Sequence, residues 1–350
     1  MGRLPITLSI LPTYRCTAAC EECCFGCGPD IQGQIPSERI CSYIDQVAAI
    51  DSVRQVVFSG GEPFLIGAAL DVAVAEATNR RMHTRCVTNA FWAQNEETSY
   101  ERLKKLKKAG LKELNISTGD HHQKFVPPDN VVYASRAALE LDIQTVVVVE
   151  SMQGREFTAE DIVKDSKLSP ILSDFKKKQL FQVIQSPWIS VTGNHQTDHD
   201  QSMYLSRENL MRRHGCDSVL SSLAITPREE LRACCGILME KIPELNLGSL
   251  REKPLAMLCK DAQEDFMKIW LYVEGPEHIL EWLARKDPCM DWEGKYVHQC
   301  EVCRALYRDF RIRELVRENF QEKVPDVLFR FSLLDEFRLR RAVRNPLNFL

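Results

Sequence analysis

Three cysteines near the start of the chain have a spacing that could hold an iron–sulfur cluster. Cys16, Cys20 and Cys23 are separated by four and three positions and follow an apolar, alternating segment at residues 6–11. We expect that segment to form a strand, and the cysteines to lie on the loop between it and a helix, where three thiolates can converge. A [4Fe–4S] cluster normally has four cysteine ligands. With only three cysteine ligands, one iron of the cluster stays open to a small chelating ligand.

Two simpler interpretations of these cysteines are open at this point. They could form a structural zinc site with Cys24 or Cys27 as the fourth ligand. They could also be buried free thiols, because cysteine packs well as a small apolar side chain. The spacing favours a cluster over zinc, and a second motif downstream decides between them.

That second motif is Gly60-Gly61-Glu62, which ends an apolar segment at residues 56–58. Paired glycines let the backbone come close to a ligand, and the Glu62 carboxylate could accept a hydrogen bond from an ammonium group. Alone, this sequence would be typical of an ordinary turn. On the strand that follows a Cys-x3-Cys-x2-Cys loop, it closely resembles the S-adenosylmethionine (SAM) contact of the radical SAM superfamily.

The composition narrows the class of protein. The chain has 350 residues, a net charge of -4 and 27% charged residues, so no basic field points to nucleic acid as a partner. No apolar run reaches the roughly 18 residues of a membrane span, and the first predicted strand begins almost at once, so we expect neither a membrane helix nor a signal peptide. We therefore expect a cytoplasmic protein with one large α/β domain and a smaller module.

The fourteen cysteines fit poorly with a disulfide framework, because the cytosol keeps thiols reduced. They fall in two groups, with Cys86 alone between them. The first group is Cys16, Cys20, Cys23, Cys24, Cys27 and Cys41, and the second is Cys216, Cys234, Cys235, Cys259, Cys289, Cys300 and Cys303. This grouping predicts two metal sites.

Apolar segments alternate with segments of helical periodicity in the first half of the chain. We predict strands at residues 6–11, 55–58, 85–89, 111–117, 143–150 and 180–184, and helices at residues 36–50, 67–81, 100–109 and 130–141. Such alternation predicts a parallel sheet, whose ligands bind beyond the carboxyl ends of the strands. Cys16, Glu62, Asn89 and Ser117 lie at those ends, so we expect them to face one site.

The pattern changes after residue 187, and we place a domain boundary between about residues 190 and 215. Residues 311–350 are charged and have a helical pattern. We expect a packing or peptide-docking helix there rather than a nucleic-acid-binding one.

The second cysteine group could hold a second cluster. Cys300-Glu-Val-Cys303 offers two ligands, and Cys216 and Cys234 would complete four thiolates. A fully ligated cluster is suited to electron transfer rather than to substrate binding. A structural zinc site with the same four residues stays open. Cys235 is harder to explain as a ligand, because neighbouring side chains seldom face the same metal.

Taken together, several segments resemble the radical SAM peptide epimerases that make epipeptides. The similarity runs in order from the first strand to about residue 308, and the C-terminal forty or so residues lack it. It rests on residues 22–27, 59–62, 88–92, 116–117 with His122 and 125–126, 187–191, 234–235 and 300–303.

The resemblance implies an α/β fold, a partial (β/α)6 TIM barrel of radical SAM type with a C-terminal SPASM/twitch-like auxiliary cluster domain. The core would be residues 1–205, the auxiliary domain residues 206–310 and a helical extension residues 311–350. It implies two [4Fe–4S] clusters, one held by Cys16, Cys20 and Cys23 and an auxiliary one by Cys216, Cys234, Cys300 and Cys303. SAM would be bound by Gly60, Gly61, Glu62, Asn89 and Ser117, whereas Cys24 and Cys27 are assigned no ligand role.

The activity implied is conversion of an L-residue to a D-residue in a ribosomally made precursor peptide. A 5′-deoxyadenosyl radical made from SAM would remove the Cα hydrogen, and Cys235, which matches the family's hydrogen donor, would deliver one to the opposite face. The auxiliary cluster would help to restore the thiol. A reducing partner such as flavodoxin or ferredoxin would supply electrons.

Two other functions stay open. A related radical SAM enzyme could cross-link its peptide through a thioether or carbon–carbon bond, which would lower the peptide mass by two hydrogens. A non-enzymatic iron–sulfur or zinc sensor or scaffold would leave Gly60-Gly61-Glu62 unexplained. The chain also departs from the family, since Leu220 and Gly119 stand where acidic residues would match, and these departures leave the substrate undetermined.

Overall fold

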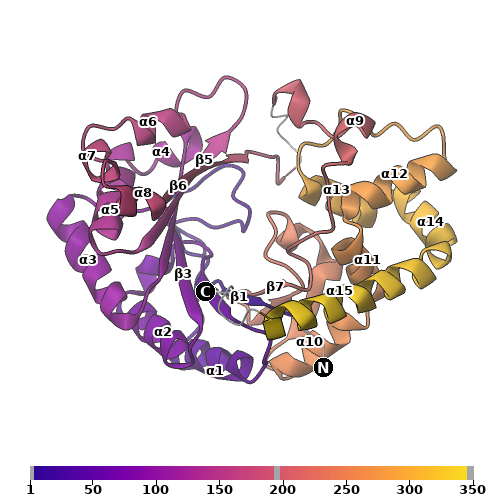
Figure 1. Cartoon of the computed structure of the whole chain (residues 1–350), viewed down its shortest axis with the longest axis horizontal. Coiled ribbons are helices and arrows are strands. Elements are labelled where there is room, and N and C mark those ends of the chain that lie inside the picture. The colour runs from indigo at the N-terminus through magenta and orange to yellow at the C-terminus, as the bar shows by residue number, and fades with distance from the viewer. Residues whose placement is uncertain (1–3, 193–197, 345–350) are drawn as a thin grey trace.

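The structure is a computed structural model that describes residues 4–192 and 198–344, with residues 335–344 described by their backbone alone. The predicted core domain, residues 1–205, and the predicted extension, residues 311–350, therefore each include short stretches outside the described residues. A nine-stranded sheet runs through the molecule in the order β6-β5-β4-β3-β2-β1-β7-β8-β9. Figure 1 shows the N-terminal half, in indigo to magenta, and the C-terminal half, in orange to yellow, on either side of β1 and β7.

The first half of the sheet is parallel, and each strand pairs with the next along the chain. Its strands are β1 (Thr7–Ile10), β2 (Gln55–Phe58), β3 (His83–Thr88), β4 (Glu113–Thr118), β5 (Gln144–Ser151) and β6 (Phe181–Pro187). All six predicted strands are confirmed, and their ends differ from the predicted ones by three residues or fewer.

Helices cover the outer side of this parallel sheet (Figure 1). They are α1 (Ser37–Ala48), α2 (Ala68–Asn79), α3 (Glu96–Ala109) and α5 (Pro128–Glu140), and all four were predicted. Ile40, Ile44 and Val47 of α1 show how this works, because their helical spacing places them together in the hydrophobic core under the sheet. Helix α3 begins earlier than predicted, because the Asn95 side chain accepts a hydrogen bond from the Thr98 N–H (2.9 Å) and caps it.

Shorter elements complete this half and were not predicted as helices. Helix α4 (Asp120–Gln123) follows β4, and three short helices lie between β5 and β6. These are α6 (Ala159–Val163), α7 (Ser169–Leu172) and α8 (Phe175–Gln179), and the 3-10 turn η1 (Pro63–Ile66) follows β2.

The sheet does not end at the predicted domain boundary. Strand β7 (Ser222–Ile225) pairs in parallel with the free edge of β1, and β8 (Glu230–Arg232) and β9 (Asn246–Ser249) continue it in antiparallel fashion. These strands are three or four residues long, too short to show a period of two, and they were not predicted.

The rest of the C-terminal half is helical and has its own hydrophobic core, which contains Trp270 and Trp292. Its helices are α9 (Arg207–Leu210), α10 (Leu255–Gln263), α11 (Phe266–Val273), α12 (Pro276–Lys286), α13 (Gln299–Arg308), α14 (Phe310–Asn319) and α15 (Val324–Arg344). This half also has the 3-10 turns η2 (Gln201–Met203) before α9, η3 (Met239–Lys241) and η4 (Pro243–Leu245) between β8 and β9, and η5 (Phe320–Glu322) between α14 and α15. The predicted helical pattern after residue 311 is present in α14 and α15. Across the part of the chain that the structure describes, every helix is too short or too polar to cross a membrane.

Candidate active site

The first three cysteines lie on a loop that follows β1 and closes where the Cys16 N–H donates to the Gly28 carbonyl (3.0 Å). All three are half-buried and line a cavity of about 230 Å³. The other residues that line it include several at or just beyond the carboxyl ends of β2 to β6: Ser59, Gly60, Asn89, Ser117, Glu150 and Trp188. The cavity therefore lies where a parallel sheet places its ligand.

Hydrogen-bond donors surround the sulfurs of this loop. The Ala18 N–H donates to the Cys16 sulfur (3.4 Å), and the Cys27 N–H donates to the Cys23 sulfur (3.3 Å). The thiols of Cys24 and Cys27 also donate to Cys23 and lower its pKa, because they stabilise the thiolate. Cluster ligands must be thiolates, so this donor set fits an iron–sulfur cluster, with Cys24 and Cys27 as supports.

For the other two predicted ligands, burial shifts the pKa in the opposite direction. It raises the pKa of Cys16 to about 11 and that of Cys20 to about 12, because the charged form loses its hydration. Both thiols would therefore have to release a proton when a cluster binds.

Gly60 and Gly61 let the end of β2 lie directly against the cysteine loop. The Gly61 N–H donates to the Thr13 carbonyl (3.0 Å). A Cβ on Gly61 would lie 2.2 Å from the Arg15 carbonyl oxygen, and one on Gly60, where φ is +112°, would lie 3.0 Å from the Leu11 Cβ. The glycines are thus required by this close packing as well as by the cavity that they line.

We expected the Glu62 carboxylate to face the ammonium group of the ligand. In the structure, it points into the protein interior instead. It is fully buried, and it is not among the residues that line the cavity. Its oxygens accept hydrogen bonds from the Phe64 N–H (3.0 Å), the Thr88 hydroxyl (2.9 Å) and the Asn89 N–H (2.9 Å). Burial raises the pKa of Glu62 to about 7. These protein donors occupy the carboxylate, and one of them is the Asn89 backbone.

Asn89 is held by Glu62 so that its side chain reaches the cysteine loop. Its amide nitrogen donates to the Cys16 sulfur (3.6 Å) and to the Thr17 hydroxyl (3.0 Å). Asn89 and Ser117 both line the cavity, as their places at strand ends predict.

Glu150 on β5 was missed from the sequence and accounts for one departure from the family. Its carboxylate accepts from the His121 N–H (2.9 Å) and is hydrogen-bonded to the His122 ring. A Cβ on Gly119 would lie 2.6 Å from that carboxylate. Glu150 thus fills the space of the acidic side chain that Gly119 lacks. Asp120 instead accepts from the backbone of residues 156 and 157 (2.9 Å each).

Residues 190–192, which follow β6, tie the cysteine loop to helix α13. Glu22 is 4% exposed and accepts hydrogen bonds from the N–H groups of Val191 (2.7 Å) and Thr192 (2.9 Å). From the other side, Arg304 donates to the carbonyls of Ser190 (3.3 Å) and Val191 (3.1 Å). Glu22 lies between two predicted ligands of the first set, and Arg304 follows a ligand of the second.

The second cysteine set comes together in the C-terminal half. A Cβ on Gly236 would lie 3.2 Å from the Cys300 sulfur and 3.6 Å from the Cys234 sulfur, so these two sulfurs flank one backbone position. Burial raises the pKa of Cys303, and the charges of Cys234, Cys300 and Cys216 raise it further. The four predicted ligands are therefore neighbours.

Helix α13 places Cys300 at its first turn. The His298 ring accepts a hydrogen bond from the Cys300 N–H (3.1 Å), and the Glu301 carboxylate accepts from the His298 N–H (3.0 Å). Burial lowers the pKa of His298 to about 4. This capping fixes the position of the helix end that carries two predicted ligands.

All fourteen cysteines lie within the described residues and are free thiols. In that part of the chain, no three His, Cys, Asp or Glu side chains form a group that could hold a single metal ion. A cluster distributes its cysteines over several iron atoms, so its ligands need not converge on one point.

The surroundings of Cys235 include residues from both halves of the chain. It is half-buried, its N–H donates to the Ser218 hydroxyl (3.3 Å), and it does not line the cavity, although Ile237 does. Burial raises the pKa of Cys235, and a hydrogen bond from Ser9 of β1 partly offsets this. The pKa of Cys24 is raised by its hydrogen bond to Cys23, by burial and also by the charge of Cys235. Cys235 is thus close to the first loop and adjacent to Cys234.

Comparison with known proteins identifies part of the chain. Residues 10–168 match the model of the radical SAM superfamily. This segment is less than half of the chain; it begins at the last residue of β1 and holds β2 to β5 and all three cysteines of the first set. The predicted α/β fold of radical SAM type is confirmed by this match and by the parallel sheet.

One curated relative and several solved structures are similar to the chain. YydG of Bacillus subtilis (strain 168), whose name assigns it to peptide biosynthesis, is 25% identical over 146 residues, which cover 41% of this chain and 46% of the relative. BtrN in complex with AdoMet and 2-DOIA is 13% identical, covers 79% of this chain and 90% of its own, and has a TM-score of 0.45. Streptococcus suis SuiB bound to S-adenosylmethionine is 15% identical. The alignment covers 75% of this chain and 66% of the SuiB chain, with a TM-score of 0.43.

Proposed function

We propose that this chain is a radical SAM enzyme that converts an L-residue of a ribosomally made peptide to a D-residue. The radical SAM domain and the similarity to a protein named for peptide biosynthesis support the class of enzyme and of substrate. The place of Cys235 next to Cys234 in the chain, and its proximity to Cys24 of the first loop, support the choice of epimerisation.

In the first site, different residues would bind the cluster and SAM. Cys16, Cys20 and Cys23 would hold a [4Fe–4S] cluster, which when bound with SAM supplies its reductive cleavage to methionine and a 5′-deoxyadenosyl radical. Asn89 and Ser117 line the space that SAM would occupy. Glu62 keeps the Asn89 backbone in place and does so without facing the ligand.

Cys235 provides the hydrogen atom for the opposite face of the substrate carbon. Once the Cα hydrogen has left with the adenosyl group, the Cα radical takes the hydrogen of the Cys235 S–H bond, and a thiyl radical remains. One electron and one solvent proton restore the thiol. Cys216, Cys234, Cys300 and Cys303 would hold an auxiliary cluster next to Cys235, suited to supplying that electron.

The test is Cys235→Ala, with Cys289→Ala as the control because Cys289 is an exposed thiol that is not a predicted ligand of either cluster. The reconstituted Cys235→Ala enzyme should keep the iron content of wild type and still form 5′-deoxyadenosine with the precursor peptide from a neighbouring short reading frame. It should form little D-residue. In heavy water, wild type should add one deuterium at the epimerised Cα, because a thiol hydrogen exchanges with solvent.

Other outcomes would replace the proposal. Loss of the second cluster in Cys235→Ala would make this residue a ligand. A wild-type product lighter by two hydrogens, with no deuterium gained, would mean cross-linking. Absence of SAM cleavage by a fully reconstituted protein would favour a sensor or scaffold.

A further inference from the structure

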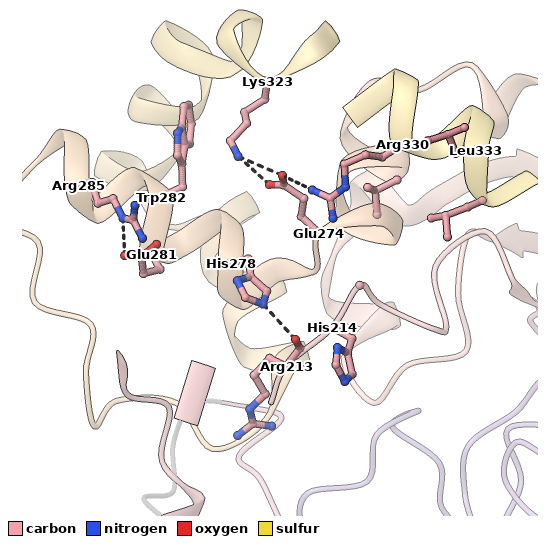
Figure 2. A pocket seen from close by; sticks show the side chains of 13 residues that line it. Arg213, His214, Glu274, His278, Glu281, Trp282, Arg285, Lys323, Arg330 and Leu333 are labelled. Atoms are coloured by element: carbon pink, nitrogen blue, oxygen red, sulfur yellow. Dashed lines mark hydrogen bonds and ion pairs between the residues drawn. The ribbon is translucent and has the colours of Figure 1, made fainter. Parts of the chain in front are cut away.

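A second cavity, of about 660 Å³, lies in the C-terminal half and shares no lining residue with the first (Figure 2). Its walls are residues 213–215, the segment from the end of α11 through α12, and residues 323–334 at the start of α15. Beside the cavity, the backbones of residues 214–215 and 272–275 pack closely, because a Cβ on Gly215 would lie 2.1 Å from the Tyr272 carbonyl and one on Gly275 2.3 Å from the His214 carbonyl. The proposed reaction does not use this cavity.

The cavity is positively charged in a chain whose net charge is -4. Four cations line it, Arg213, Arg285, Lys323 and Arg330, against two carboxylates, Glu274 and Glu281. Without charge on its two histidines, the lining therefore has an excess of two positive charges.

The carboxylates of this cavity are recessed and engaged, whereas two of the cations are exposed. The Glu274 side chain is 7% exposed, and it pairs with Lys323 and Arg330 (3.0 Å each) and accepts from the Trp270 ring N–H (2.8 Å). Glu281 is 12% exposed and Arg285, its partner, 73%. Figure 2 shows these pairs around the cavity. Arg330 also pairs with Asp326 (3.5 Å), which does not line the cavity, so a ligand entering the cavity meets the Arg285 guanidinium before it meets Glu281.

An apolar wall stands beside these cations. Trp282 of α12 and Leu333 and Leu334 of α15 line the cavity, and Leu334 is 39% exposed. The Lys323 ammonium lies 5.3 Å from the centre of the Trp282 ring, so a cation and an aromatic face are presented together. The ligand that complements this wall carries carboxylates and apolar side chains.

We propose that this cavity binds an acidic, partly apolar segment of the precursor peptide, remote from the residue that is modified. The inference rests on the proposed function, which supplies a peptide long enough to reach a second site. Binding energy from a remote segment can position the reacting residue without taking part in the chemistry. The cavity's charge is opposite to that of a Glu-rich segment, and its wall accepts Leu-sized side chains.

The experiment uses the full chain and a fluorescein-labelled peptide of four Glu-Leu repeats, with a Gln-Leu peptide as the neutral probe. Arg285→Gln/Arg330→Gln should weaken binding of the Glu-Leu peptide about tenfold in fluorescence anisotropy. Lys105→Gln/Lys108→Gln removes the same charge from two exposed positions on α3 and should leave affinity unchanged. The Gln-Leu peptide should bind at least tenfold more weakly than the Glu-Leu peptide.

Hydrogen exchange of the wild type locates the peptide even if the double variant fails to fold. The Glu-Leu peptide should protect residues 276–286 and 324–334 and leave residues 16–27 unchanged. No protection there, or equal weakening by both double variants, would overturn the proposal. Protection of these helices by flavodoxin but not by the peptide would reassign the cavity to an acidic electron carrier. Failure of SAM cleavage alone would refute the proposed function and leave this binding result standing.

Discussion

The two cysteine sets differ in how the chain assembles them. The first lies within eight residues of one loop, at the rim of a cavity, with backbone and thiol donors around its sulfurs. The second is drawn from residues 216, 234, 300 and 303, and Cys234 is 7% exposed in the hydrophobic core of the C-terminal half. A locally assembled set can leave one side open to a ligand. A set assembled by the fold includes at least one buried member, Cys234, so its loss should affect stability as well as chemistry.

The largest expected effects come from removing each set of ligands. Cys16→Ala/Cys20→Ala/Cys23→Ala should remove about half of about eight irons per chain, if each set holds one [4Fe–4S] cluster, and abolish SAM cleavage. The melting temperature of this triple variant should differ little from that of wild type. Cys300→Ala/Cys303→Ala should remove the other half and lower the melting temperature, because the half-buried Cys303 packs against the hydrophobic core of the C-terminal half. Iron and sulfide analysis after anaerobic reconstitution and thermal melting measure both, and tightly held zinc in the second set would contradict the auxiliary cluster.

Two glycine-to-alanine substitutions compare how tightly the two sets are packed. At Gly61 the new Cβ would meet backbone, and at Gly236 it would meet a side chain. In Gly61→Ala the new Cβ would lie 2.2 Å from the Arg15 carbonyl, so the cysteine loop must move. We expect a loss of about 3 kcal/mol in the free energy of unfolding and little iron in the first set. In Gly236→Ala the new Cβ would lie 3.2 Å from the Cys300 sulfur, which can shift, and the loss should be about 1 kcal/mol. Equal losses from both would show that the second set is as tightly packed as the first.

An intermediate effect is expected from removing the hydrogen bonds by which Glu22 holds residues 190–192 between the cysteine loop and α13. Glu22→Gln places an amide nitrogen against the N–H groups of Val191 and Thr192, which now donate to a carboxylate. A buried donor left without its partner costs about 1–3 kcal/mol. Residues 188–192 should exchange amide hydrogens faster, and more 5′-deoxyadenosine should form per modified peptide. Glu38→Gln, at an exposed position on α1, is the control. An unchanged rate of amide hydrogen exchange at residues 188–192 in Glu22→Gln would show that Glu22 does not hold this segment in place.

The smallest expected effect is a pH dependence of opposite sign in the two regions. The pKa of Glu62 is raised from 4.5 to about 7, so the stability that its neutral form provides is complete below about pH 4.5 and is lost as the pH rises through 7. The pKa of His298 is lowered from 6.5 to about 4, so its neutral form stabilises the fold above about pH 6.5, and that stability is lost as the pH falls toward 4.

Melting temperatures between pH 4.5 and 8 of single variants test these signs. Glu62→Gln should reduce the fall in melting temperature toward pH 8 by a few degrees. His298→Asn keeps an acceptor for the Cys300 N–H and should reduce the fall toward pH 4.5. A variant whose pH profile runs parallel to that of wild type would refute the assigned shift for that residue.

The sequence predicts well what short-range patterns determine. The strands that hold the first site are apolar segments bounded by turns, and Asn89 and Ser117 were placed correctly because parallel strands end on the same edge of a sheet. The orientation of Glu62 was not predictable, because it depends on Thr88 and Asn89 donating from the next strand.

Features that need long-range packing were missed for the same reason. Glu150 joins the site only because β5 lies beside β4, and its role beside Gly119 is visible only in space. The second cavity requires α12 and α15 to pack around residues 213–215, and no motif in the sequence marks it. The charged pattern after residue 311 did predict helices there, without indicating what they enclose.

The pairing of β1 with β7 has a consequence for synthesis on the ribosome. Thr7 pairs with Gln55 on one side and with Ser222 on the other, so one edge of β1 has no partner until the chain has grown past residue 225. At 5–20 residues per second, that wait is about 10–40 s after β1 emerges. An unpaired strand edge is a template for aggregation. A fragment ending at residue 205 would keep that edge open permanently, and we expect it to aggregate when expressed alone.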